Sequence, residues 1–171
     1  MTATPIDANL TDTQISIDLN TLAGLRAGVQ ATQVIHDLLL GDPLPGTPHH
    51  GFESNVVPFV LHPTITAPAS ASLAAGTISI GFAPSVGKAQ RVTLFLYRHN
   101  ALSSAKAYSF PAPLDNGIPT SSPATEVASI TFSFSGVEPG NYLAYAQVDG
   151  ADSLLQLVAG QFDSPRVTIT V

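Results

Sequence analysis

Apolar and polar residues alternate with a period of two along most of this chain. The alternation is clearest in four stretches: Ile15–Leu19, Ile78–Phe82, Ile130–Ser135 and Val167–Val171. A period of two puts the apolar side chains on one face of a strand, which is typical of antiparallel strands with one face in a core. Val92–Tyr97 is apolar on both faces, which predicts a central strand or one covered by a neighbour.

Turn-forming residues separate these stretches. Pairs such as Pro-Gly, Asn-Gly and Asp-Gly recur between them, at the short and fairly regular spacing of a sandwich. Only two windows have helical character: Thr21–Gly28 is short and interrupted by glycine, and the leucines of Asp152–Ala159 would make at most one turn. The predicted fold class is therefore all-β, an immunoglobulin-like or fibronectin-like antiparallel β-sandwich.

The number of strands differs between the two parts of the chain. Residues 63–171 contain six or seven predicted strands, which is enough for a complete immunoglobulin-like sandwich. Residues 1–62 contain three (Gln14–Leu19, Val29–Leu40 and Asn55–Leu61), and the Pro/Gly/His-rich loop before the third is expected to stay out of any ladder. Three strands do not close a sandwich. We therefore predict that residues 1–62 are half of an immunoglobulin-like domain, completed in cis or by a partner.

A Pro-Gly turn precedes one of the predicted strands. Pro139 and Gly140 lie just before Tyr142, which opens an alternating run to Val148. This order is typical of a tyrosine corner, in which the ring packs at the sandwich end and the hydroxyl reaches a backbone group upstream. The alternative is an ordinary core tyrosine. We assign Pro139, Gly140 and Tyr142 a structural role.

Composition and charge exclude several classes of protein. The chain has 171 residues, a net charge of -6, 11% charged residues and no cysteine. The acidic balance argues against nucleic-acid binding and anionic membranes, and the lack of cysteine excludes disulfides and thiolate zinc sites. With 44% apolar residues and a mean hydropathy of +0.27, the chain is expected to fold, or to be completed by something it packs against.

Targeting signals are not found. Met1–Leu10 lacks the basic and apolar regions of a standard signal peptide, and the apolar runs are too short for a transmembrane helix. We therefore expect no direct membrane insertion and a cytoplasmic location.

The candidate chemistry is weak. Four histidines (His36, His49, His50 and His62) fall within 27 residues, but no two of them have the i, i+4 spacing of a helical metal site. Acidic loop residues such as Asp149 and Asp152 lack the dense spacing of a calcium loop. No serine stands in a Gly-x-Ser-x-Gly motif, and no glycine-rich phosphate loop is present. We predict no metal, no cofactor and no enzymatic activity.

Several longer strings resemble one known family. They are LRAGVQATQVIH (25–36), TPHHGFESN (47–55), FVLHPTI (59–65), YLAYAQVDGADS (142–153) and SPRVTI (164–169). Together they resemble the C-terminal immunoglobulin-like extension of cap, or tail-terminator, proteins of extracellular contractile injection systems. These systems are phage-tail-like particles of the virulence-cassette and antifeeding-prophage type. The family's N-terminal cap domain has no counterpart here, so the resemblance implies a particle component rather than the capping activity itself.

Two functional hypotheses follow. The first is a non-enzymatic structural or accessory subunit of a contractile injection particle. It would be cytoplasmic and associated with the particle, and it could be released together with the particle. It would dock by β-edge and apolar-surface contacts onto other particle subunits or onto itself. The predicted partner-binding residues are Ile15, Ile17, Leu19, Val29, Val34, His49, His50 and Phe52. The second hypothesis is a free-standing immunoglobulin-like module that recognises a glycan or a cell-surface protein.

Overall fold

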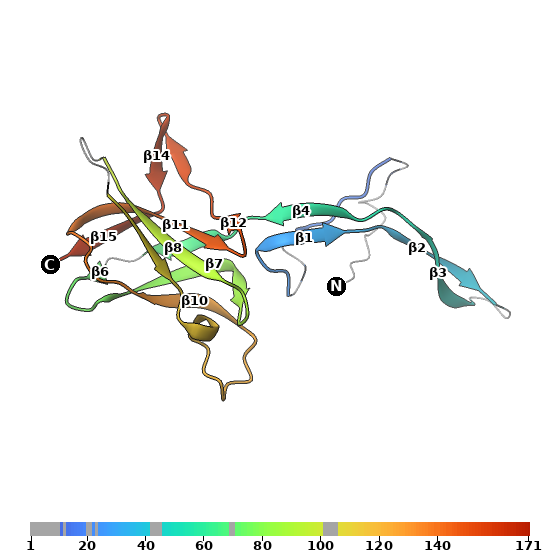
Figure 1. Cartoon of the computed structure of the whole chain (residues 1–171). Coiled ribbons are helices and arrows are strands. Elements are labelled where there is room, and N and C mark those ends of the chain that lie inside the picture. Colours follow the sequence, from blue (N-terminus) through green and yellow to red (C-terminus); the bar gives the residue numbers. More distant parts are fainter. Residues whose placement is uncertain are drawn as a thin grey trace.

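The computed structural model describes residues 11, 13–19, 22, 24–41, 46–68, 71–100 and 106–171. Strands form nearly all of the regular structure in these ranges, which confirms the predicted all-β class. Figure 1 shows a sandwich of two sheets and a two-stranded arm that projects from one end of it. Among the described residues, no helix is long and apolar enough to cross a lipid bilayer.

The sandwich consists of a three-stranded and a larger sheet. In the first sheet the order is β10 (Glu126–Ser133), β7 (Thr77–Gly87), β5 (Thr64–Pro68). In the second it is β6 (Ala71–Ser72), β15 (Arg166–Thr170), β11 (Gly140–Val148), β8 (Val92–Arg98), β9 (Ala107–Pro111). The sandwich pairings are antiparallel except for β6 with β15. This is the strand arrangement of an immunoglobulin-like sandwich.

The core lies between the two sheets and follows the predicted alternation. Ile80 and Ile130 are directly opposite each other on β7 and β10, and both are fully buried. On the second sheet, Leu94 and Leu96 of β8 lie opposite Ala146 and Ala144 of β11. Each large side chain therefore faces a small one across the pair. The prediction of a central strand at 92–97 is also confirmed, because β8 is paired on both sides.

The turn between β10 and β11 has the geometry of a tyrosine corner. Tyr142 is fully buried, and its hydroxyl donates a hydrogen bond of 2.7 Å to the backbone carbonyl of Glu138. Its ring packs edge-on against Tyr108, with 5.8 Å between ring centroids. Pro139 lies at the bend before it and Gly140 begins β11, close to the order that the sequence pattern predicts.

A one-turn 3-10 segment, η3 (Leu114–Gly117), joins β9 to β10 and braces the neighbouring turn. Asn116 is 4% exposed and has a left-handed backbone conformation. Its amide nitrogen donates to the carbonyls of Gly87 and Gln90 at 2.8 and 2.9 Å. These bonds hold the β7–β8 turn, on which the root of the arm rests.

The arm is one long hairpin built from two paired segments. At its base, β1 (Gly28–Thr32) pairs with β4 (Val57–Leu61); farther out, β2 (Ile35–Leu40) pairs with β3 (Thr47–Glu53). Both pairs are antiparallel, so the chain runs outward along β1 and β2 and returns along β3 and β4 (Figure 1). Completion of this part of the chain by a partner stays a prediction.

Three predictions of individual elements in the first 62 residues are wrong. Gln14–Leu19 has only an isolated bridge at Ile15 and is not a strand, because alternation gives a segment an apolar face but no neighbour to pair with. Val29–Leu40 is two strands, interrupted at Gln33 and Val34. The Pro/Gly/His-rich loop contains β3: Pro48 lies opposite Leu39 on the edge of a two-stranded ribbon, where its missing N–H interrupts no central ladder.

Two short strands, β12 (Ala151–Asp152) and β15, line the same edge of β11, and a hairpin projects between them. The last residues of β11 pair with β12, and its first residues pair with β15, so Ser153 and Pro165 lie along the same edge. Between them, β13 (Gln156–Val158) and β14 (Gln161–Ser164) form a projecting hairpin (Figure 1). The helical turn considered for Asp152–Ala159 is therefore wrong, because the backbone of Ser153 bonds to Ala146 of β11.

The distribution of core residues predicts that residues 63–171 fold alone. Among the described residues, Ala27 is the only one of the first 62 in the main core cluster. Removing residues 1–62 should therefore cost about 3 kcal/mol of unfolding free energy. The loss comes from the buried side chain of Ala27, from the hydrogen bonds of Ala27 with Gln90 and of His62 with Asp152, and from the exposed ion pair of Arg26 with Glu126. Urea unfolding followed by circular dichroism, with the full chain as the control, measures this. A fragment without a cooperative transition would contradict the division at residue 63.

Candidate functional site

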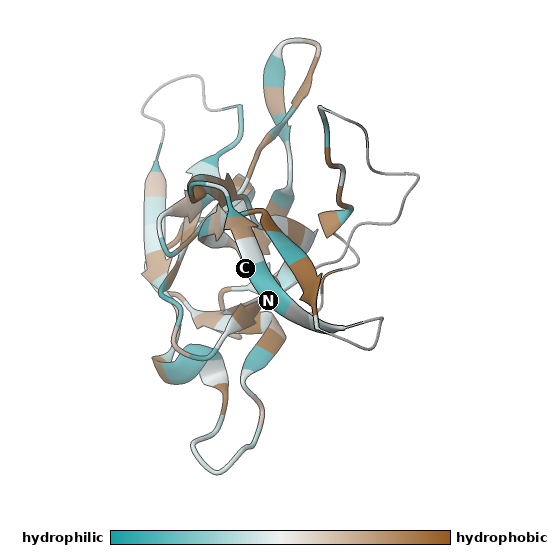
Figure 2. Cartoon of the chain, turned by 90° about the vertical axis from the view of Figure 1, so that its right-hand side faces the viewer, coloured by the Kyte–Doolittle hydropathy of each residue, from teal (hydrophilic) through white to brown (hydrophobic). Residues whose placement is uncertain are grey.

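The arm is rich in exposed apolar side chains. Of the nineteen exposed large hydrophobic residues in the described part, nine lie between residues 29 and 60. They are Val29, Val34, Ile35, Leu39, Leu40, Phe52, Val56, Val57 and Val60. A two-stranded hairpin is at best marginally stable in water, and exposed apolar side chains gathered on one element are typical of interaction surfaces. Figure 2 views the molecule from the side on which the arm projects, and its hydropathy colours show hydrophobic segments on the strands of the arm.

The register of β1 with β4 sorts the side chains at the base of the arm into two faces. Val29 lies opposite Val60 and Ala31 opposite Pro58, and all four residues are exposed. Opposite residues in an antiparallel pair share a face, so this face is wholly apolar and open to solvent. Phe59, on the other face, is half-buried. The base of the arm thus has one more protected face and one open apolar face.

A cluster of polar bonds joins the two segments of the arm where the pairing is interrupted. Gln33 donates through its side-chain amide to a Glu53 carboxylate oxygen and to the Ser54 carbonyl, at 3.1 and 2.9 Å. The backbone of Val34 donates to the Ser54 hydroxyl at 2.9 Å, and the Ser54 backbone donates to the Val34 carbonyl at 2.9 Å. These bonds keep the inner and outer ribbons connected.

Gly51 marks a bulge in the outer ribbon. The register shifts between His36 and Asp37, and Gly51 is the residue of β3 that the shift leaves unmatched. A Cβ atom at Gly51 would lie 2.6 Å from the side chain of Leu38 and 2.7 Å from the His36 carbonyl. Any larger residue would have to displace the backbone. The glycine is therefore required by close approach, and the bulge twists the outer part of the arm.

The structure places the predicted partner-binding residues in two groups. Val29, Val34 and Phe52 lie on the arm and are 68%, 47% and 75% exposed, and His49 and His50 are exposed on β3. The remaining three precede the arm, outside any strand, and are 40–43% exposed: Ile15, Ile17 and Leu19.

Other exposed apolar residues were not predicted from the sequence. On the arm, β2 lacks alternation, so its leucines gave no signal of facing solvent. The projecting β13–β14 hairpin adds a second apolar surface, in a stretch considered for a helical turn. Its exposed members are Leu157, Val158 and Phe162, with Leu154 just before it.

The histidines do not converge on one point. His49 Nε2 lies 3.0 Å from the Thr47 hydroxyl, and His50 Nδ1 lies 3.5 Å from a Glu53 carboxylate oxygen. His62 Nδ1 lies 2.7 Å from the Asp152 carbonyl, at the root of the arm. Within the described ranges, no group of three or more histidines and carboxylates could hold a metal ion.

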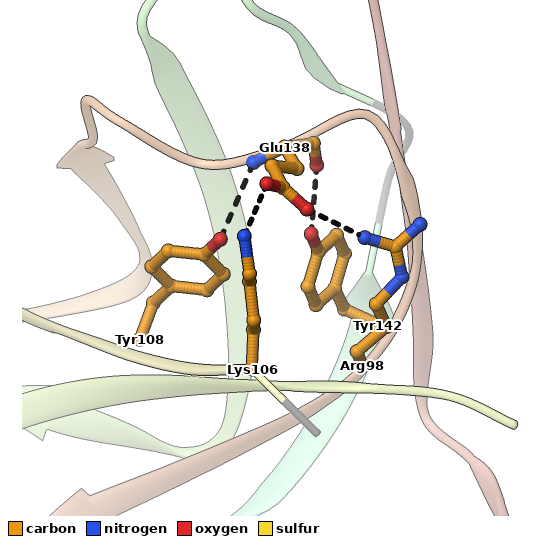
Figure 3. Close-up of polar contacts among 5 residues, drawn as sticks. All are labelled: Arg98, Lys106, Tyr108, Glu138 and Tyr142. Carbon is orange, nitrogen blue, oxygen red and sulfur yellow. Dashed lines mark hydrogen bonds and ion pairs between the residues drawn. The ribbon is translucent and has the colours of Figure 1, made fainter. Parts of the chain in front are cut away.

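Glu138 is the centre of the most connected charged cluster (Figure 3). Its carboxylate forms an ion pair with Lys106 and accepts a hydrogen bond of 2.9 Å from Arg98. The hydrogen bond from Lys106 lowers the pKa of Glu138, and the same bond raises the pKa of Lys106. The backbone N–H of Glu138 donates to the Tyr108 hydroxyl, and the backbone carbonyl of Glu138 accepts from the Tyr142 hydroxyl. The carboxylate joins two cations, one on β8 and one just before β9, beside the tyrosine corner, so the cluster stabilises this turn.

Three aromatic rings form a row on the second sheet. Tyr145 packs against Phe95 and Tyr97, with ring centroids 4.9 and 6.1 Å apart. The Tyr145 hydroxyl donates to an Asp152 carboxylate oxygen at 3.0 Å, and burial, helped by this bond, raises the pKa of Tyr145 to about 12. Tyr97 is 42% exposed at the end of the row.

A polar depression of about 330 Å³ lies at the arm end of the sandwich. Arg91, Thr93, Gln147, Asp149 and Gly150 line it. The Asp149 carboxylate already accepts a bond of 2.9 Å from the Arg91 backbone, and Gln147 donates to Asp152. These bonds engage two of the lining side chains, Asp149 and Gln147, in stabilising the neighbouring turns.

The pKa shift of Glu138 predicts a change of stability with pH. A lowered folded-state pKa gives stability that is present above the unfolded-state pKa, near 4.5, and is lost as pH falls through the folded value. The wild type should therefore lose its advantage over Glu138→Gln below about pH 4.5. Urea midpoints at several pH values measure this. In a Lys106→Met background the pH-dependent difference should shrink; an unchanged difference would contradict the assignment.

Comparison with known proteins identifies one family. No curated protein and no solved structure matches the chain. A family model does match residues 63–168, which begin with the first residue of the sandwich and end within β15. The match covers more than half of the chain, and it leaves out the arm. The chain therefore belongs to the family described as a domain of unknown function, DUF8756.

Proposed function

We propose that this chain is a non-enzymatic structural or accessory subunit of a contractile injection particle. It docks through its arm onto other particle subunits or onto a second copy of itself. The observation that carries the proposal is the open apolar face of the arm, on which Val29 and Val60 lie side by side, 68% and 49% exposed. The resemblance of five strings to cap-protein extensions supports the particle as the setting.

The arm supports docking in two ways. Each ribbon has two strands, so its outer backbone N–H and C=O groups are available to pair with a further strand. The apolar side chains add burial, and the described charged residues of the arm's strands, Asp37 and Glu53, both lie in the outer ribbon, on β2 and β3. An interface with few charges has little desolvation cost to offset. Assembly in the cytoplasm, followed by a particle-associated state, fits this mode of action.

The second candidate is a free-standing module that recognises a glycan or a cell-surface protein. The aromatic row of Phe95, Tyr145 and Tyr97 favours it, because sugars stack on exposed rings. Of these three rings only Tyr97 is exposed, and the Tyr145 hydroxyl is hydrogen-bonded to Asp152. The row therefore offers less free surface than the arm. A module of this kind would be a monomer at all concentrations.

Phe52→Lys tests the docking role of the arm. Phe52 is 75% exposed, so the change should leave folding intact while placing a charge in the docking surface. Association should weaken about tenfold or more, as for a central interface residue. Two measurements report it: light scattering of the purified chain over a concentration series, and the fraction of tagged chain that sediments with particles from its natural host.

Leu157→Lys is the matched control. Leu157 is 62% exposed on β13, away from the arm, and the change adds the same charge. It should leave association unchanged. A concentration-independent monomer that is absent from particles would favour the binding module, and equal effects of the two variants would remove the arm as the docking element.

A further inference from the structure

The root of the arm is packed against the end of the sandwich. Ala27, immediately before β1, is 1% exposed, and Pro63, just after β4, is fully buried. His62, next to Pro63, lies 2.7 Å through Nδ1 from the carbonyl of Asp152. The outgoing and the returning chain are thus both held where they meet the sandwich.

One side chain joins the outgoing chain to two turns of the sandwich. The amide nitrogen of Gln90 donates to the Ala27 carbonyl at 2.8 Å and to a carboxylate oxygen of Asp149 at 3.0 Å. The amide oxygen of Gln90 accepts from the Gly87 backbone at 2.9 Å. Gln90 therefore links the arm, the β7–β8 turn and the β11–β12 turn through a single planar group.

The partners of Gln90 are themselves fixed. The second carboxylate oxygen of Asp149 accepts from the Arg91 backbone at 2.9 Å, which aims the first one at Gln90. Gly28, the first residue of β1, has φ of +123°, and a Cβ atom there would lie 3.6 Å from the Asp149 side chain. The chain thus leaves the root with a backbone conformation that favours glycine, beside the side chains of Asp149 and Gln90.

We infer that Gln90 is a positioning residue that sets the direction in which the arm projects from the sandwich. The inference deepens the proposed function and rests on it only for the arm's role in docking. A hairpin fixed by covalent bonds alone would swing about Ala27 and Pro63. The bond from Gln90 fixes the orientation of the Ala27 carbonyl, in the peptide group that leads into Gly28 at the start of β1, and so restrains the swing.

Gln90→Glu separates this role from a role within the sandwich. The new carboxylate still accepts from the Gly87 backbone, but it has no proton to donate and would face the Ala27 carbonyl and Asp149. Adding Asp149→Asn gives the pair a donor again, because the new amide can donate to the carboxylate at position 90 while its oxygen still accepts from the Arg91 backbone. The double variant thus restores the bond between the two turns and leaves Ala27 without its donor.

The direction of the arm can be measured on the purified full-length chain. The chain has no cysteine, so spin labels at Asp37→Cys on β2 and Ser133→Cys on β10 are unique. In the parent protein we expect a narrow distribution of distances between the labels. In Gln90→Glu and in the double variant we expect a broad one, with amide exchange in Gly28–Thr32 faster by about three- to tenfold, the effect of one lost hydrogen bond.

Two comparisons decide the inference. The double variant should regain the parent's urea midpoint while its distance distribution stays broad, which a purely structural role would not produce. Gln156→Glu, which makes the same substitution on the projecting β13–β14 hairpin, where the Gln156 amide oxygen accepts from the Ser164 hydroxyl, should leave the distribution narrow. A narrow distribution in Gln90→Glu, or one that narrows again in the double variant, would overturn the inference. The distance measurement involves no partner. A broad distribution in Gln90→Glu, combined with a parent protein that does not associate, would therefore reject only the proposed function.

Discussion

A two-stranded hairpin cannot bury both faces of its own strands, and this constraint governs the molecule. The sandwich avoids it by packing two sheets together, so that Leu94 and Leu96 are fully buried against the opposite sheet. The arm has no second layer over Val29 and Val60, which stay open. The chain thus combines a domain that satisfies its own apolar surface with an extension that does not. That contrast is why we assign docking to the arm and support to the sandwich.

The support is local and polar rather than hydrophobic. Ala27 is the arm's contribution to the main core within the described residues, and Gln90 holds its carbonyl at 2.8 Å. A directional bond fixes an angle better than an apolar contact, which tolerates sliding. Asn116 holds the carbonyls of Gly87 and Gln90 from the core side, so the restraint continues into the sandwich. The restraint that we infer on the arm therefore reaches the part of the chain that contains the buried core.

The sequence predicted the sandwich better than the arm, for a physical reason. Strands such as those at 78–82 and 167–170 bury one face, so selection for a core leaves a period of two, and the structure has buried side chains there. Tyr142 could be placed because its Pro-Gly turn is a local signal. The arm has apolar residues on both faces, and its pairing depends on a bulge at Gly51 and on side-chain bonds of Gln33 and Ser54. None of these leaves a periodic pattern, and Gln90 contacts Ala27 across 63 residues.

A held arm also changes the energetics of docking. Ordering a backbone costs roughly 1–2 kcal/mol per residue, so a flexible extension would lose much of the free energy gained from burying Val29 and Phe52. A hairpin already paired through β1–β4 and β2–β3 has met most of that cost during folding. Holding its root removes part of the remaining orientational cost. A modest apolar surface can then be enough for assembly, which fits a chain with only 11% charged residues and an interface that offers little electrostatic attraction.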